Sequence, residues 1–120
     1  MELSEHQEAI EDADSEDAMR EEIERVIDEE DVVVFMKGNK LMPQCGYSAR
    51  AVEVVAHYRD KEFATVDVLR DERIREALED VTDWPTIPQV FVDGEFLGGS
   101  DTVMEMHEEG GLEEKMAAVA

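Results

Sequence analysis

A nearly continuous apolar run, Val32–Met36, is the feature that most constrains the fold of this chain. Such a run is typical of a strand covered on both faces, as in a parallel or mixed sheet between helices. A loop with glycine and proline follows, then the only cysteine, Cys45, and then a helix-compatible stretch, Ser48–Tyr58. Phe63–Val68 comes next as a second strand. A strand, a helix and a strand at this spacing predict a parallel pair joined by a right-handed crossover.

Periodic apolar residues predict further helices around this unit. Spacings of three and four put apolar residues on one face of Ala18–Glu30 and on one face of Asp71–Asp80. Asp93-Gly94 separates two short apolar runs, which predicts a two-residue β-hairpin. The remaining predicted helices are one capped by Ser100 or Asp101 and a closing one over Leu112–Val119.

The first seventeen residues differ in composition from the rest of the chain. They are acidic and contain few large apolar residues, so we expect residues 1–17 to form a flexible segment. Residues 18–120 are then one domain, long enough for a single core. The predicted order of elements is helix, βαβ, helix, ββ, helix, helix.

The surroundings of Cys45 suit a reactive thiol. A cysteine at a helix start is close to unpaired N–H groups and to the positive end of the helix dipole, which favour the thiolate. Gly46 allows a sharp turn there, and Ser48 can bond exposed amides of the first helical turn. The alternative is a buried structural cysteine, but the neighbouring proline and glycine favour an exposed loop.

Charge is distributed unevenly around this cysteine. The formal net charge is -22, yet residues 32–52 contain no Asp or Glu. A buried strand explains the first positions of this acid-free stretch, but not the three bases Lys37, Lys40 and Arg50. A neutral-to-positive island around a thiol suits a thiolate or an anionic ligand.

The overall composition limits location and partners. Strong negative charge disfavours nucleic acid and anionic membrane surfaces as partners. One cysteine excludes an intramolecular disulfide and is consistent with a reducing cytoplasm. With no long apolar run and no basic, apolar leader, we expect a soluble cytoplasmic protein. Acid spread over the whole sequence resembles the proteins of salt-loving microbes, whose surroundings screen self-repulsion.

Two further loops could form a ligand site with the cysteine loop. The segment Trp84–Gln89 contains two prolines, and a cis peptide bond before Pro88 would free the backbone of Ile87 for an extended, peptide-like ligand. Gly98–Asp101 could offer backbone N–H groups and a carboxylate at a helix start. A rigid connector and an ordinary capped turn are the respective alternatives. The three histidines, His6, His57 and His107, have no metal-ligand spacing and are expected at the surface.

Several separated motifs together resemble one family. FMKGxxxxPxCGYS, followed by VL-x4-IR-x8-WPTIPQVFVDGEFLGGSD, is similar to the monothiol glutaredoxins, usually described by a Cys-Gly-Phe-Ser motif. The resemblance covers about residues 18–120 and implies an α/β, thioredoxin-like fold. That fold has a central four-stranded mixed sheet flanked by helices, here with an added N-terminal helix. Tyr47 replaces the usual Phe, and Asn39-Lys40 lacks a proline often found there, so we expect a less rigid loop.

The resemblance also implies a ligand set. At the position of Cys45 the family ligates a [2Fe-2S] cluster shared by two subunits, and a groove beside it holds glutathione. The matching positions for glutathione are Lys37 and Arg75 for its glycine carboxylate, Ile87 for its backbone, and Ser100 with Asp101 for its γ-glutamyl end. From the residues alone, the alternative for Arg75 is a solvated helix face.

These features support two functional hypotheses. In the first, the protein is an iron–sulfur carrier that accepts a cluster from a scaffold and passes it to apo-proteins. A [2Fe-2S] cluster usually needs four thiolates, so two chains and two low-molecular-weight thiols would complete the set in a cluster-bridged homodimer, while the apo form is a monomer. In the second, it is a glutathione-dependent thiol–disulfide oxidoreductase in which external glutathione resolves the mixed disulfide. A redox-inert interaction domain is a third reading. The thiol is glutathione or a shorter γ-glutamyl thiol that lacks the glycine.

Overall fold

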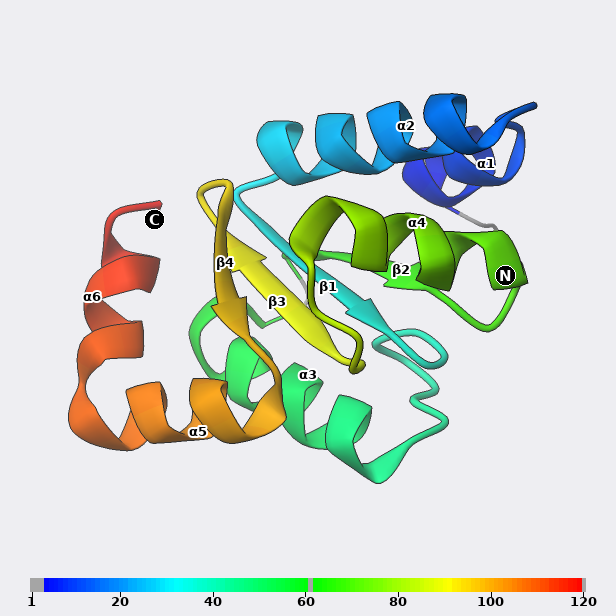
Figure 1. Ribbon diagram of the computed structural model, residues 1–120. Helices are drawn as coiled ribbons and strands as arrows, with labels where there is room; N and C mark the ends of the chain where they lie inside the picture. The colour runs from blue at the N-terminus through cyan, green and yellow to red at the C-terminus, as the bar shows by residue number, and fades with distance from the viewer. Residues whose placement is uncertain (1–3, 61, 120) are drawn as a thin grey trace.

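A mixed sheet of four strands lies at the centre of the computed structural model, which describes residues 4–60 and 62–119. The spatial order is β2-β1-β3-β4 (Figure 1). The inner strand β1 (Val32–Met36) pairs in parallel with β2 (Ala64–Asp67) and antiparallel with β3 (Gln89–Val92). The last strand, β4 (Glu95–Gly98), forms a hairpin with β3 around Asp93-Gly94. The parallel crossover and the hairpin are both confirmed.

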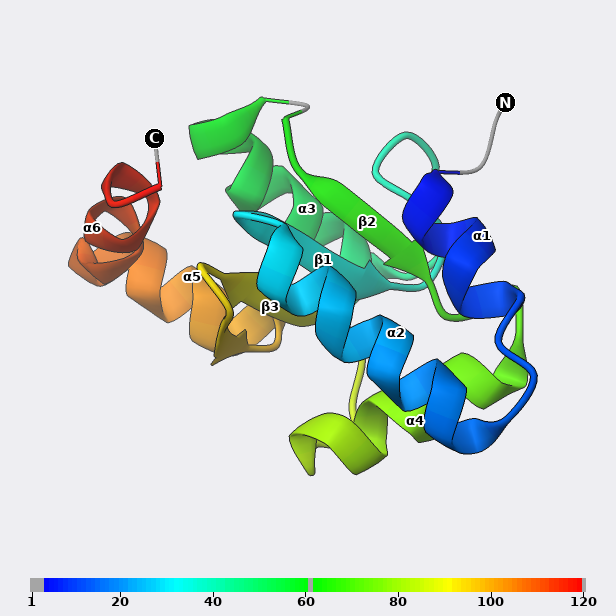
Figure 2. The same cartoon turned by 90° about the horizontal axis from the view of Figure 1, so that it is seen from above.

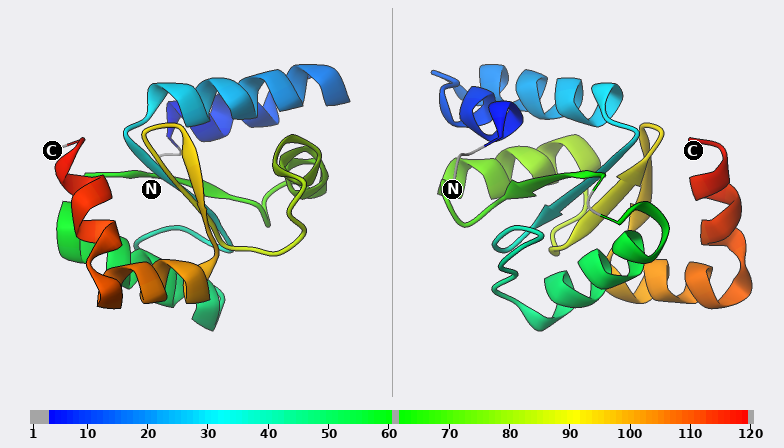
Figure 3. Two further views of the ribbon diagram at one scale, coloured as in Figure 1. Left: turned by 60° about the vertical axis from the view of Figure 1, so that its left-hand side comes forward. Right: turned by 180° about the vertical axis from the view of Figure 1, so that it is seen from behind.

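Helices cover both faces of this sheet, which explains why β1 is apolar throughout. Alternate residues of a strand point to opposite faces. Val33 and Phe35 pack on the side of α2 (Glu16–Glu29) and α4 (Glu72–Thr82). Val32, Val34 and Met36 pack toward the opposite helices. Those helices are α3 (Gly46–Arg59), α5 (Ser100–Glu109) and α6 (Gly111–Ala117); Figure 3 shows α5 and α6 across the sheet from α2.

The structure forms a helix in the segment for which flexibility was expected. Helix α1 (Glu5–Glu11) begins after Ser4, whose side chain accepts a hydrogen bond from the Gln7 amide. Ile10 is 0% exposed and Gln7 is 3% exposed, so the helix is packed into the molecule. Figure 2 shows α1 beside α2 and close to the end of β2. Residues 1–3 lie outside the described residues.

The other boundaries differ from the sequence-based ones by a few residues. Helix α3 begins at Gly46, directly after Cys45, and α5 begins at Ser100 with Gly99 as its cap. The prediction that Ser100 or Asp101 caps α5 is therefore wrong, because the turn at Gly98-Gly99 already ends in extended backbone. None of the described helices is long and apolar enough to cross a membrane.

Replacing Ile10 by alanine tests whether α1 is part of the folded unit. The change removes a fully buried side chain, and we expect the free energy of unfolding to fall by about 2–4 kcal/mol. The measurement is chemical denaturation followed by circular dichroism. Glu8→Ala, an exposed position on the same helix, should change stability by less than about 0.5 kcal/mol. Equal stability of Ile10→Ala and the unchanged protein would contradict the packing of α1.

Candidate functional site

Cys45 lies at the junction of the loop after β1 and helix α3. It is the N-cap residue of α3, with extended backbone angles of φ −153° and ψ 136°. Its carbonyl oxygen accepts the first helical bond from the Ala49 amide at 2.8 Å. The side chain is half-buried and the thiol is free. The thiol therefore lies where the open amides of a helix start are available.

The side chain of Ser48 connects this helix start to the sheet. Ser48 is completely buried, and its Oγ accepts a hydrogen bond at 3.1 Å from the backbone amide of Lys37. We expected Ser48 to bond amides of its own helix, but the amide that it binds belongs to the end of β1. The bond fixes the first turn of α3 against the strand that precedes the loop.

The pKa of the Cys45 thiol is lowered from its ordinary value. Hydrogen bonding from the Ser48 backbone N–H is the largest cause, and partial burial acts in the opposite direction. The Tyr47 backbone N–H, the positive charge of Lys37 and the Ser48 hydroxyl add to the lowering. Each favourable contribution stabilises the thiolate relative to the thiol. The environment is therefore that of a nucleophile or a metal ligand.

The loop that leads to the thiol is held by its own hydrogen bonds. Asn39 Oδ1 accepts from the amides of Leu41 and Met42, at 2.9 and 3.0 Å. Gly38 has φ +88°, and a Cβ there would collide with the Met42 carbonyl oxygen, so the turn requires glycine. Asn39, expected to leave the loop less rigid, thus supplies the bonds that fix the turn.

A groove of about 410 Å³ adjoins the first turn of α3 at Tyr47, two residues after Cys45. One wall is the loop before β3, in which the Ile87–Pro88 peptide bond is cis, as the sequence predicted. The other wall is the start of α5, with Ser100 buried and Asp101 exposed. The groove can therefore present a strand-like backbone on one side and a helix start with a carboxylate on the other.

Two residues to which the sequence analysis gave no individual role make contacts with these walls. Gln89 Nε2 donates to the carbonyl oxygens of Trp84 and Thr86, at 2.8 and 3.2 Å, and so braces the first wall from within. Arg50 Nη1 of α3 lies 3.9 Å from Asp101 Oδ1, one of the residues that line the groove. The sequence identifies Arg50 only as one of the three bases in the acid-free stretch 32–52, and this charge pattern is the feature that could have assigned Arg50 to the site.

The structure brings together most, but not all, of the residues predicted to bind a ligand. Ile87, Ser100 and Asp101 line the groove. Lys37 is not among the lining residues, but it is close enough to Cys45 to influence the pKa of the thiol. Arg75 lies on the exposed face of α4, outside the residues that line this groove. Within the described part of the chain, no group of three or more His, Cys, Asp and Glu side chains could hold a metal ion.

The three histidines are less uniform than expected. Only His57 is exposed, whereas the other two are half-buried. His107 Nδ1 shares a hydrogen bond of 2.5 Å with the Tyr58 hydroxyl, and His6 Nε2 lies 3.1 Å from Glu30 Oε2. None of these contacts involves the thiol loop, so the histidines have structural partners away from Cys45.

A search against protein families finds one that spans the sheet and the thiol loop. The glutaredoxin family model matches residues 32–97, from β1 to β4. The chain belongs to the glutaredoxin family. The matched segment contains Cys45 and the wall before β3, so the family is recognised through the site as well as the fold.

Individual relatives place this glutaredoxin among the monothiol members. A monothiol glutaredoxin of Synechocystis is 46% identical over 94 residues, which are 78% of this chain and 87% of the relative. The solution structure of reduced poplar apo GrxS14 superposes with a TM-score of 0.73 at 35% identity, covering 85% of this chain and 93% of that one. A buckwheat glutaredoxin–glutathione complex gives a TM-score of 0.73 at 25% identity, covering 97% and 96%.

The pH dependence of thiol alkylation tests the environment of Cys45. Because its pKa is lowered, the thiolate persists to lower pH, and the iodoacetamide rate should reach its plateau at a lower pH than for a free thiol. In Lys37→Gln the inflection should move upward, since one favourable charge is lost. Lys115→Gln, which changes a charge on α6, should leave the inflection unchanged. An unshifted profile in Lys37→Gln would contradict the electrostatic contribution.

Proposed function

We propose that this glutaredoxin binds a [2Fe-2S] cluster together with glutathione, or a related γ-glutamyl thiol, and transfers the cluster to apo-proteins. The observation that carries the proposal is a lone thiol of lowered pKa, half-buried beside a groove. Ser48, three residues further on, is buried and bonded to the end of β1. The chain therefore has no resolving thiol, and Cys45 must find partner thiols elsewhere.

The stoichiometry of ligands supports a shared cluster. A [2Fe-2S] cluster is usually held by four thiolates, and this chain contains one cysteine. Two chains and two low-molecular-weight thiols complete the set. The holo form is then a homodimer that depends on its cargo, and the apo form is a monomer. Such an assembly comes apart when the cluster leaves, which suits a carrier between a scaffold and its recipients.

The groove residues suit a tripeptide-like thiol. Ile87 offers its backbone, and Ser100 and Asp101 meet the γ-glutamyl end. Lys37 lies outside the groove lining but near Cys45, where its charge attracts a carboxylate. The buckwheat relative forms a complex with glutathione, which supports glutathione as the class of ligand. Arg75 remains a proposed partner of the glycine carboxylate, although it lies outside the residues that line the groove. A thiol that lacks glycine would not need that partner.

A glutathione-dependent thiol–disulfide oxidoreductase is the second candidate, favoured by the lowered pKa of Cys45. The Cys45 thiolate attacks the glutathione sulfur of a protein mixed disulfide, and the protein leaves as its thiolate. A second glutathione thiolate then attacks the Cys45–glutathione disulfide, which releases oxidised glutathione and regenerates Cys45. The same groove serves this reaction, so only an experiment on the purified protein separates the two candidates.

The context of this activity follows from composition. We propose a glutaredoxin domain over residues 18–120, against which helix α1 packs. We also propose that it works in a reducing cytoplasm, because the chain carries a single free cysteine. The net charge of -22 suits a medium of high salt, where screening lowers the repulsion between two copies. Scaffold and recipient proteins are the expected partners, and nucleic acid and membranes are not.

Anaerobic reconstitution with iron, sulfide and glutathione tests the carrier function. We expect a coloured protein whose size in solution is that of a dimer, and a colourless monomer for Cys45→Ser, which lacks the protein ligand. Visible absorption and size-exclusion chromatography with light scattering provide the measurement. A colourless protein that rapidly reduces glutathione mixed disulfides would contradict the carrier proposal and support the oxidoreductase.

Lys37→Glu tests the groove. The variant replaces an attractive charge beside Cys45 by a repulsive one, so we expect glutathione to bind at least about tenfold more weakly. Isothermal titration at fixed ionic strength gives the affinity. Lys115→Glu makes the same charge change on α6 and should leave binding nearly unchanged. Equal affinities for the two variants would count against the groove assignment.

A further inference from the structure

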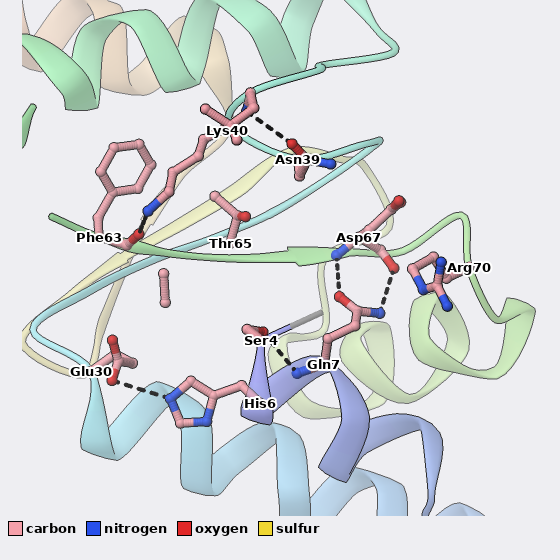
Figure 4. Close-up of a pocket in the computed structure, with 12 residues that line it drawn as sticks. Ser4, His6, Gln7, Glu30, Asn39, Lys40, Phe63, Thr65, Asp67 and Arg70 are labelled. Carbon is pink, nitrogen blue, oxygen red and sulfur yellow. Dashed lines mark hydrogen bonds and ion pairs between the residues drawn. The ribbon is translucent and has the colours of Figure 1, made fainter. Parts of the chain in front are cut away.

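The outer edge of strand β2 borders a second hollow, away from the groove at Tyr47. Strand β2 is at the end of the sheet and pairs only with β1. The hollow has a volume of about 650 Å³ and lies between α1 and the loop 39–41. In Figure 4 the side chains of Asn39 and Lys40 lie on one side of β2, and those of His6 and Glu30 lie on the other.

At one end of this edge, a side chain makes the two backbone hydrogen bonds that a neighbouring strand would otherwise make. The Val68 amide donates to Met36 of β1 at 2.9 Å, so by the alternation of a strand the backbone of Asp67 points away from β1. The side chain of Gln7 in α1 binds both backbone groups of Asp67. Gln7 Oε1 accepts from the Asp67 amide at 2.8 Å, and Gln7 Nε2 donates to the Asp67 carbonyl oxygen at 3.2 Å. Figure 4 shows both bonds.

The other end of the edge is covered by the thiol loop. Lys40 Nζ donates to the carbonyl oxygen of Phe63, two residues before Thr65. By the same alternation, the amide and carbonyl of Thr65 point outward between the two covered positions. Among the described residues, no hydrogen bond to either Thr65 group is recorded on that side. One residue of open strand edge thus faces a hollow large enough for several side chains.

We propose that this hollow binds an extended, neutral-to-basic peptide segment of a partner protein, which adds to the sheet at Thr65. The open amide and carbonyl of Thr65 supply the two backbone bonds of a strand pair, and the side pockets supply selectivity. The proposal does not depend on whether Cys45 carries a cluster or reduces disulfides.

The two sides of the hollow differ in chemistry, which suits the alternating side chains of an extended segment. On the loop side, Lys40 Nζ lies over the buried ring of Phe63, 4.9 Å from its centroid, and Leu41 is 56% exposed, so Leu41 offers the apolar contact on this side. On the opposite side, the half-buried carboxylate of Glu30 suits a basic one. The next residue of an added strand would point back to the first side.

Charge favours a neutral-to-basic segment over an acidic one. The whole chain carries a charge of -22, which repels an acidic peptide at low salt, while the lining of the hollow is itself balanced, with Lys40 and Arg70 against Glu30 and Asp67. A basic or neutral segment is attracted or unopposed. The loop that forms one side continues to Cys45, so a docked segment contacts the same loop that presents the thiol.

Titration of the ¹⁵N-labelled protein with a synthetic peptide tests the proposal. The probe is the acetylated and amidated peptide KVTVK, and we expect saturable shifts of the Thr65 amide and its neighbours. The same peptide methylated on the backbone nitrogen of its central residue, which cannot complete a strand pair, should bind at least about tenfold more weakly. The acidic peptide EVTVE should also bind at least about tenfold more weakly at low salt.

A matched pair of variants locates the contact on the protein. Thr65→Pro removes the outward amide at an edge position that tolerates proline, whereas Thr65→Val keeps that amide and removes only the hydroxyl. We expect Thr65→Val to bind the peptide normally and Thr65→Pro to lose binding. If Thr65→Pro does not fold, the methylated peptide decides the question with the unchanged protein.

Three results would overturn the proposal. The first is saturation with no shift at Thr65, and the second is equal affinity for the methylated peptide or for the acidic one. The third is a shift of the Thr65 amide with protein concentration in the absence of peptide, accompanied by dimerisation, which would assign the edge to a second copy.

Discussion

The hydrogen bond from the Lys37 amide to the Ser48 hydroxyl is the contact on which the thiol site depends. A fully buried hydroxyl is costly unless it is bonded, so this contact fixes where α3 begins relative to the end of β1. The position of α3 in turn aims the amides of Tyr47 and Ser48 at Cys45, which lowers the pKa of its thiol. A cysteine in place of Ser48 would put a sulfur, a weaker hydrogen-bond acceptor, where the hydroxyl now accepts from the Lys37 amide.

Asp67, at the end of β2, is a second residue whose hydrogen bonds connect several segments around the thiol loop. Its carboxylate accepts from the amides of Gly38 and Leu69, at 3.0 and 2.9 Å, while its backbone is bound by Gln7. One residue thus joins the loop, the edge strand and helix α1. The acidity of the chain has a structural use here, because one carboxylate oxygen, Oδ1, accepts hydrogen bonds from both of these backbone amides.

The sequence predicts the sheet well because its elements carry strong local patterns. The run at Val32–Met36 and the turn at Asp93-Gly94 each admit few alternatives. Helix α1 escapes prediction because its anchors are Ile10 and a polar residue, Gln7, whose partner lies sixty positions along the chain. The thiol and the groove walls lie in recognisable motifs, and so do Lys37 and Arg75, but neither of these two residues lines the groove. The hollow beside β2 combines residues from distant segments without any periodic signal.

The side-chain amide of Gln7 also bears on how this protein resists aggregation. A free strand edge can template the addition of identical strands, and proteins commonly block such edges by charge, proline or coverage. On the β2 edge, Gln7 closes one end and Lys40 the other, so that among the described residues of this strand only the outward backbone groups of Thr65 stay open. An opening of that width can accept one short segment, but it offers too little backbone to start a fibril.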